Sequence, residues 1–103
     1  IGSIDVIEII EIRSTCEIGY VISKKYGNKG IMTETLRAVM NYLFNTVGFN
    51  RIQLRHMTEN PVSGRVMVKC GMEYEGILRQ YGVKNTGERC DTAIYSILKS
   101  DIL

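Results

Sequence analysis

The segment SKKYGNKGIMTETLRAVMNYLFNTVG (Ser23–Gly48) contains the clearest structural signal in the chain, a loop that leads into a helix. Two spaced glycines and three lysines stand before a run in which apolar residues recur at the spacing of one helix face, namely Ile31, Met32, Leu36, Val39, Met40, Leu43, Phe44 and Val47. Gly48 follows, where a helix C-terminus favours a residue in the left-handed conformation. The segment therefore predicts a loop followed by a long amphipathic helix that ends at Gly48.

The loop itself has features of an anion-binding site. Gly27 and Gly30 let the backbone approach a ligand without a Cβ in the way, and the unpaired N–H groups at a helix start favour negative charge. Lys24, Lys25 and Lys29 add positive charge. The spacing matches neither the nucleoside-triphosphate loop nor the dinucleotide-binding loop. On these residues alone, a phosphate site and an ordinary solvated turn both stay open.

Strands are predicted on both sides of this segment, because β-branched residues are dense and apolar residues alternate. A second helix begins at Asn60-Pro61, with Asn as N-cap and Pro as the first helical residue, and Gly71 closes it. The predicted strands cover residues 1–12, with a change of phase between Val6 and Ile7, and residues 16–23, 51–57, 74–81 and 89–98. The order β-β-α-β-α-β-β predicts an α+β fold with a mixed sheet.

Composition narrows the class of protein. The chain of 103 residues suffices for one domain, residues 1–103, and its net charge of +2 is too small to indicate a nucleic-acid partner. No apolar run approaches the length that spans a bilayer. Cys16, Cys70 and Cys90 are widely separated, so we predict free thiols, no metal site and a cytoplasmic location. Because the chain begins at Ile1 inside a predicted strand, we expect an N-terminally truncated domain.

Three stretches occur in an order that resembles the Gcn5-related N-acetyltransferase (GNAT) superfamily. They are EIGYVISKKYGNKGIMTE (Glu17–Glu34), ENPVSGRVMVKCGM (Glu59–Met72) and EGILRQYGVKNTGERCDTAIYSILK (Glu75–Lys99). Their pattern is most similar to the bacterial ribosomal-protein N-acetyltransferase branch (RimJ/RimL type). The resemblance implies an enzyme that transfers acetyl from acetyl-CoA, bound as a substrate, to a primary amine by direct attack in a ternary complex. The amine would belong to a protein N-terminus, such as that of a ribosomal protein, or to a small molecule.

The resemblance also implies which residues bind the coenzyme. The pyrophosphate would lie on the loop and helix start formed by Lys25, Tyr26, Gly27, Asn28, Lys29, Gly30 and Ile31. The pantetheine arm would bind as an added strand to the backbone groups of Tyr20, Val21 and Ile22. Asn60 would approach the pantetheine end, Ser63 would lie near the sulfur, and Lys69 or Arg65 would reach the outer phosphates.

Direct transfer requires that the acceptor amine lose a proton and that the leaving thiolate gain one. Glu17 matches a strand position at which related acetyltransferases carry a glutamate and is our first candidate for the base, with an edge-strand charge as the alternative. His56, the single histidine, is the second, unless its neighbours merely hold it on the strand. Ser63 is the candidate proton donor, although it could instead bond to its own helix end. Asn60 completes the candidate catalytic set.

The resemblance covers nearly the whole chain but lacks the family's first strand, two helices and second strand, which build much of the acceptor pocket. The first strand here would then be a bare, isoleucine-rich sheet edge, so we predict a homodimer through this edge, or aggregation. Two other interpretations stay open. The chain would be a coenzyme A-binding fragment without catalysis, or a structural domain whose lysine loop is a solvated turn.

Overall fold

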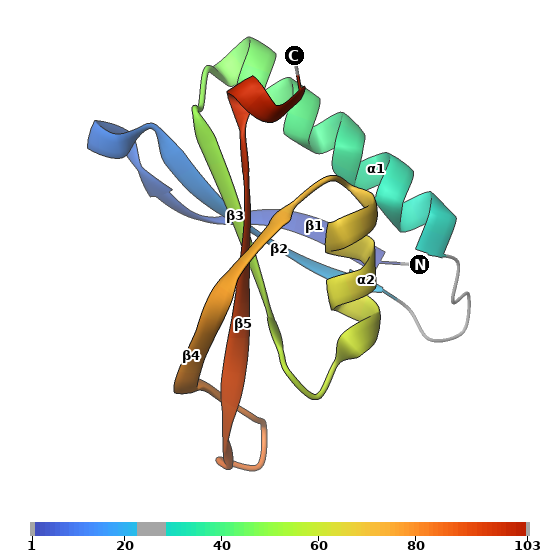
Figure 1. The fold of residues 1–103 in the computed structure, drawn as a ribbon, viewed down its shortest axis with the longest axis vertical. Helices are drawn as coiled ribbons and strands as arrows, with labels where there is room; N and C mark the ends of the chain where they lie inside the picture. The colour runs from blue at the N-terminus through green and yellow to red at the C-terminus, as the bar shows by residue number, and fades with distance from the viewer. Residues whose placement is uncertain (1, 23–28, 103) are drawn as a thin grey trace.

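The computed structural model describes residues 2–22 and 29–102, and the side chains of all of these except residues 2, 3, 21, 22, 29 and 30. The helices and strands follow the predicted order (Figure 1). They are β1 (Gly2–Ile10), β2 (Thr15–Ile22), α1 (Lys29–Tyr42), β3 (Arg51–Met57), α2 (Pro61–Lys69), β4 (Glu73–Val83) and β5 (Arg89–Leu98). The predicted α+β class with a mixed sheet is confirmed.

The five strands form one sheet in the order β1-β2-β3-β5-β4. β2 and β3 are parallel because α1 carries the chain back between them, whereas the other neighbours are antiparallel. The register of β1 against β2 shifts between Val6 and Glu8, so Ile7 is the extra residue of a β-bulge. This confirms the predicted change of phase in the first strand.

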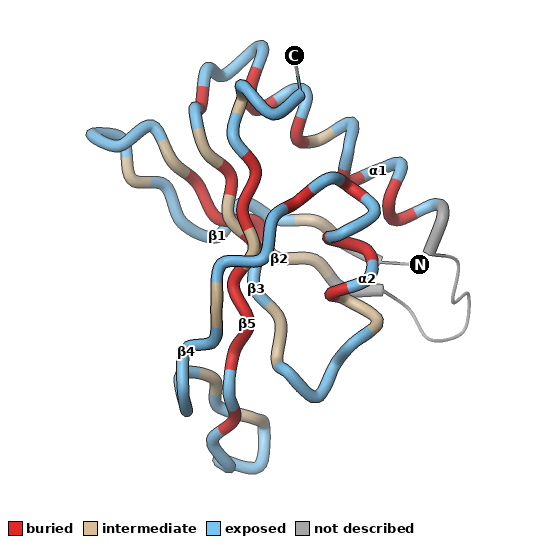
Figure 2. The backbone as a smooth tube through the Cα atoms, in the orientation of Figure 1, coloured by how far each residue is buried: buried red, intermediate tan, exposed pale blue. Residues whose placement is uncertain are grey.

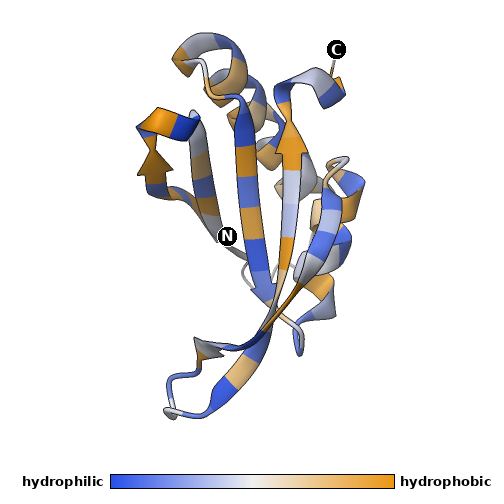
Figure 3. Ribbon diagram, turned by 60° about the vertical axis from the view of Figure 1, so that its left-hand side comes forward, coloured by the Kyte–Doolittle hydropathy of each residue, from blue (hydrophilic) through white to orange (hydrophobic). Residues whose placement is uncertain are grey.

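Both helices pack on the same face of the sheet, and the hydrophobic core lies between them and the strands (Figures 1 and 2). Leu36 of α1, Val66 of α2 and Ile52 of β3 are fully buried there. Along β3 the side chains alternate between this core and the opposite face, as the pleat of a strand requires. No helix of the described residues covers that opposite face (Figure 3), which we call the open face.

The end of the first helix differs from the prediction. α1 stops at Tyr42 and the chain continues as a π-helical turn over Leu43–Val47, which Gly48 ends with φ of 97° and an N–H···O bond of 2.9 Å to Leu43. The predicted core positions Ile31 and Val47 are wrong, since these side chains are 56% and 51% exposed. The wider π turn displaces Val47 from the buried helix face, and Phe49 beyond Gly48 is buried instead.

The second helix begins and ends where the sequence predicts. Asn60 occupies the N-cap position and Pro61 the first helical position, and Gly71 follows the helix with φ of 86°. The expected mechanism of capping is wrong, however, because the side chain of Asn60 makes no capping hydrogen bond.

Gly64 in the middle of α2 has a steric explanation. A Cβ at this position would lie 2.8 Å from Nε2 of His56 and 3.3 Å from the hydroxyl of Tyr95. The helix backbone therefore packs directly on β3 and β5, which outweighs the roughly 1 kcal/mol that glycine costs relative to alanine in a helix.

Candidate active site between two diverging strands

The parallel strands β2 and β3 stay together for only three residue pairs, from Thr15–Arg51 to Glu17–Gln53. Beyond Glu17 they diverge (Figure 1), while β2 continues to pair with β1 on its other side as far as Ile22. Among the described residues, the edge of β2 that faces β3 therefore has no strand partner over residues 18–22. An extended ligand can add to such an edge through backbone hydrogen bonds.

The two helices begin near the open end of this gap, because α1 follows β2 and α2 follows β3. Lys29 and Gly30, expected as the end of a coenzyme loop, are instead the first two residues of α1. Lys25, Tyr26, Gly27 and Asn28, also assigned to that loop, lie outside the described residues. The N-terminus of α1, which favours negative charge, lies at the place where the sequence predicted a diphosphate site.

Tyr20 connects the two sides of the gap. Its hydroxyl donates a hydrogen bond of 2.8 Å to the carbonyl oxygen of Ser63 in the first turn of α2. Burial raises the pKa of Tyr20 to about 12, so the hydroxyl stays a donor at any physiological pH. From the sequence, only the backbone of Tyr20 was expected to take part, by binding the pantetheine arm. In the structure its side chain also holds α2 next to β2. The predicted ligand residues Val21 and Ile22 are the last two of β2 and pair with β1.

Glu17 lies where the strands separate, on the open face, and is only 5% exposed. Its Oε1 accepts a hydrogen bond of 2.9 Å from Nε2 of Gln53, and its Oε2 forms an ion pair of 2.8 Å with Nε of Arg55. Gln53 accepts in turn from Nη1 of Arg51, and Nη2 of Arg51 contacts Glu75 at 2.8 Å. A hydrogen bond from Ser96, together with Arg51, lowers the pKa of Glu75. The candidate base is therefore fixed in a charged network rather than free on an edge strand.

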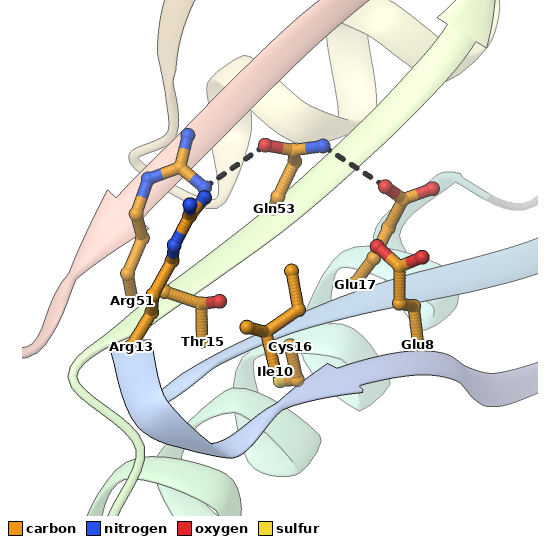
Figure 4. Close-up of a pocket in the computed structure, with 8 residues that line it drawn as sticks. All are labelled: Glu8, Ile10, Arg13, Thr15, Cys16, Glu17, Arg51 and Gln53. Carbon is orange, nitrogen blue, oxygen red and sulfur yellow. Dashed lines mark hydrogen bonds between the residues drawn. The ribbon is translucent and has the colours of Figure 1, made fainter.

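A cavity of about 370 Å³ opens on this face beside Glu17 (Figure 4). Glu8 and Glu17 line one end, and Arg13 and Arg51 line the other, with Gln53 between them. The cavity brings polar groups of β1, β2 and β3 together at the point where β2 and β3 separate. A polar molecule that enters it reaches Glu17 from the side of the sheet that the helices leave open.

His56, the second candidate base, lies on the helix side of β3. Its Nδ1 is 2.7 Å from the carbonyl oxygen of Met57, and its ring lies 5.5 Å from that of Tyr95. Nε2 is buried without a hydrogen-bond partner and faces Gly64 of α2. These contacts hold the ring between a strand and a helix, which is the packing role that the sequence left as the alternative.

The remaining candidates all belong to α2 or its cap. Asn60 is exposed at the N-cap position, and Ser63 is half-buried beneath the hydroxyl of Tyr20. Lys69, the last helical residue, is exposed and lines a hollow with Thr33, Glu34 and Arg37 of α1. Arg65 lines a different hollow, beside His56 and Tyr95. Of the two cations proposed for the outer phosphates, Lys69 is therefore the one adjacent to α1.

The three cysteines are buried and free, as predicted. Burial raises the pKa of the Cys16 thiol to about 11 and also raises that of Cys70, so neither is a reactive thiolate near neutral pH. Among residues 2–22 and 29–102, no group of three or more His, Cys, Asp or Glu side chains is placed to hold a metal ion. No helix in the same residues is long and apolar enough to span a membrane.

Sequence reasoning missed the residues that hold the candidate residues in place. Gln53 and Arg55 fix Glu17, and the guanidinium of Arg37 donates to the carbonyl of Lys69 at the end of α2. Side chains alternate along β3, so the sequence places Gln53 and Arg55 on the same face of that strand. Only the register of β3 against β2 shows that Glu17 lies on this face as well. A signal for Arg37 would have required knowing that α1 and α2 are neighbours.

Comparison with known proteins identifies the family. Residues 1–73 match the family model described as the acetyltransferase (GNAT) domain. The probable N-acetyltransferase YjcK of Bacillus subtilis is 38% identical over 102 residues, which cover 98% of this chain and 56% of that protein. The [ribosomal protein uS5]-alanine N-acetyltransferase of Escherichia coli is 36% identical over 66 residues, which cover 64% of this chain and 34% of that protein.

Solved structures give the same result. A mutant of the spermidine N-acetyltransferase SpeG from Vibrio cholerae superposes with a TM-score of 0.89 at 28% identity, over all of this chain and 60% of that chain. The chain spans about half the length of the curated relatives that it matches over nearly all its residues. By the family model, the sequence identity and the shared fold, the chain belongs to the GNAT acetyltransferase family.

Proposed function

We propose that this chain forms the coenzyme-binding part of an acetyl-CoA-dependent N-acetyltransferase. The observation that carries the proposal is the separation of β2 from β3 after three residue pairs. It leaves the backbone of β2 beyond Glu17 open to an extended ligand, and the amide-like pantetheine arm of acetyl-CoA is a ligand of that kind. The start of α1 supports placement of the diphosphate at the same end, because a helix N-terminus favours negative charge.

Candidate residues on the two faces of the sheet would play different roles if a thioester lay in the gap between β2 and β3. Glu17 lies on the open face beside the cavity, so an acceptor amine entering there would lose its proton on the side of Glu17. Ser63 lies on the helix side, beneath Tyr20, so a thiolate leaving toward the helices would meet Ser63. Backbone N–H groups at the edge of β2 would stabilise the oxyanion that develops between these sides.

The acceptor we propose is a primary amine, either of a protein N-terminus or of a small molecule. Relatives are named for both kinds, since one is a [ribosomal protein uS5]-alanine N-acetyltransferase and another a spermidine N-acetyltransferase. Direct attack within a ternary complex agrees with the opposite placement of Glu17 and Ser63, because amine and coenzyme then approach from different faces.

Isothermal titration calorimetry with acetyl-CoA, followed by a thiol-release assay, tests the proposal. The acceptors would be spermidine and peptides with N-terminal alanine or serine. We expect saturable one-to-one binding of acetyl-CoA, and thiol release that depends on an amine. Binding without thiol release would favour a coenzyme A-binding fragment. Absence of binding at millimolar acetyl-CoA would leave only a structural domain and would contradict the proposal.

A further inference from the structure

Glu17 is held by an arginine that is itself only partly buried. The side chain of Arg55 is 36% exposed and that of Glu17 is 6% exposed, and their ion pair measures 2.8 Å. An arginine with this exposure has a large rotamer entropy, and ion pairs near the surface contribute little on their own. A second contact is needed to keep the guanidinium in one position.

Tyr81 supplies that contact. The guanidinium carbon of Arg55 lies 5.0 Å from the centre of the Tyr81 ring, within the range of a cation–π interaction. Arg55 thus lies between the Tyr81 ring and the Glu17 carboxylate. Arg55 and Tyr81 also line a hollow of about 350 Å³, together with Gly82 and Thr92.

A β-bulge in β4 places Tyr81 on this face. Leu78 pairs with Thr92 and Gly82 with Cys90, so three residues of β4 lie opposite the single residue Asp91. In an unbroken ladder, Tyr81 would share a face with Ile77, whose partner Ala93 lies on the helix side. Because Gln80 inside the bulge has φ of 52°, the backbone departs from regular alternation, and the Tyr81 ring lies over Arg55 on the open face.

The bulge is held by specific contacts. Gln80 has φ of 52°, unusual for a residue other than glycine, and its N–H donates to Oδ1 of Asp91 at 2.8 Å. Gly82 packs so closely on β5 that a Cβ would lie 2.8 Å from Sγ of Cys90 and 2.9 Å from Oγ1 of Thr92. Strained bulges of this kind persist where the surrounding structure fixes them and often aim a side chain at a functional site.

We propose that Arg55 and Tyr81 are a positioning pair for Glu17, with Tyr81 acting through Arg55. This inference rests on the proposed function, in which Glu17 serves the acceptor side of the thioester. The ring keeps the guanidinium in place. The guanidinium then holds Oε2, which accepts no hydrogen bond from the described residues, through the ion pair, while Gln53 donates to Oε1 where β2 and β3 separate. Neither Arg55 nor Tyr81 needs to touch the coenzyme.

The first test reads the pair without any activity. The Nε–H signal of Arg55 can be assigned in ¹⁵N spectra of the full chain by its loss in R55K. We expect this Nε–H proton to exchange slowly with water. Tyr81→Leu should raise that exchange rate about fivefold, because the ring contact is lost, whereas Tyr81→Phe keeps the ring and should restore slow exchange. Tyr74→Leu is the matched control, because Tyr74 is on the same strand with nearly equal exposure (53% against 54%) but contacts Tyr95. Equal exchange in Tyr81→Leu and the wild type would overturn the proposal.

The second test uses amine-dependent thiol release. Tyr81→Leu and Arg55→Lys should each lower kcat about fivefold or more with little change in the KM for acetyl-CoA. The double variant should be no slower than Arg55→Lys alone, because Tyr81 acts through Arg55. Additive losses, or a loss in KM only, would overturn the positioning role. A wild-type chain that binds no acetyl-CoA would contradict the proposed function, whereas the exchange measurement decides on the pair whether or not the chain is active.

Discussion

The hydroxyl of Tyr20 on β2 donates a hydrogen bond of 2.8 Å to the carbonyl oxygen of Ser63 on α2. This bond joins the two sides of a gap whose strands no longer pair with each other. It therefore sets how far α2 lies from β2, and with that the width available to a ligand.

Tyr20→Phe should lower the free energy of unfolding by about 1 kcal/mol, the typical net contribution of one such bond, with a fall in Tm of about 4–8 °C. The stabilisation should also depend on pH. Because the pKa of Tyr20 is raised from 10.0 to about 12, the folded state holds a proton that the unfolded state loses, so stability falls as pH rises through this range. Urea denaturation at pH 8 and pH 11 measures both effects. A stability difference between wild type and Tyr20→Phe that does not shrink at pH 11 would contradict this account.

Gly64→Ala should destabilise the protein by about 1–3 kcal/mol, although alanine is the better helix former. The new methyl group would lie 2.8 Å from Nε2 of His56, whose ring is held by Met57 and Tyr95. In a His56→Ala background the obstacle is gone, so the same substitution should cost much less. Thermal unfolding of the two single variants and the double variant gives the coupling. Equal costs in both backgrounds would show that the contact with His56 is not what requires glycine.

Lys69→Gln should weaken acetyl-CoA binding several-fold, because Lys69 is the exposed cation of α2 beside α1. The loss should be smaller at 1 M salt, where exposed charges are screened. Arg65→Gln is the matched control, since Arg65 lies in the same helix but lines the hollow beside Tyr95. Calorimetric Kd values at low and high salt provide the measurement, and a larger effect for Arg65→Gln would reverse the assignment.

The outer edge of β1 should associate with another strand. Ile7 and Ile9 of this strand are 50% and 54% exposed, and within residues 2–22 and 29–102 β1 has a sheet neighbour on one side only. We expect light scattering after size-exclusion chromatography to show concentration-dependent dimers or larger species. Ile9→Lys should shift the population toward monomer, because an edge lysine opposes strand addition. A monomer at all concentrations in the wild type would contradict the predicted edge pairing.

The sequence predicted elements whose signals are local. The periodicity of α1, the Asn60-Pro61 start of α2 and the phase change at Ile7 all concern residues that are neighbours in the chain, and the structure confirms them. The exposure of Val47 was not predictable in this way, because the π turn that displaces it departs from the regular helical period.

In the candidate site, too, the sequence predicted what depends on local patterns and missed what depends on contacts between strands. A match of Glu17 to a family position suggested a base, but its partners Gln53 and Arg55 come from another strand and depend on register. Tyr81 is still less accessible to sequence reasoning, since it lies in an irregular bulge where strand alternation no longer predicts the position of a side chain.

A crystal structure of the chain with acetyl-CoA tests the central claim most directly. We predict the pantetheine arm along residues 18–22 of β2, the diphosphate at the start of α1, and the thioester between Glu17 and Ser63. A coenzyme bound anywhere else, or a gap between β2 and β3 that stays empty at saturating acetyl-CoA, would contradict it.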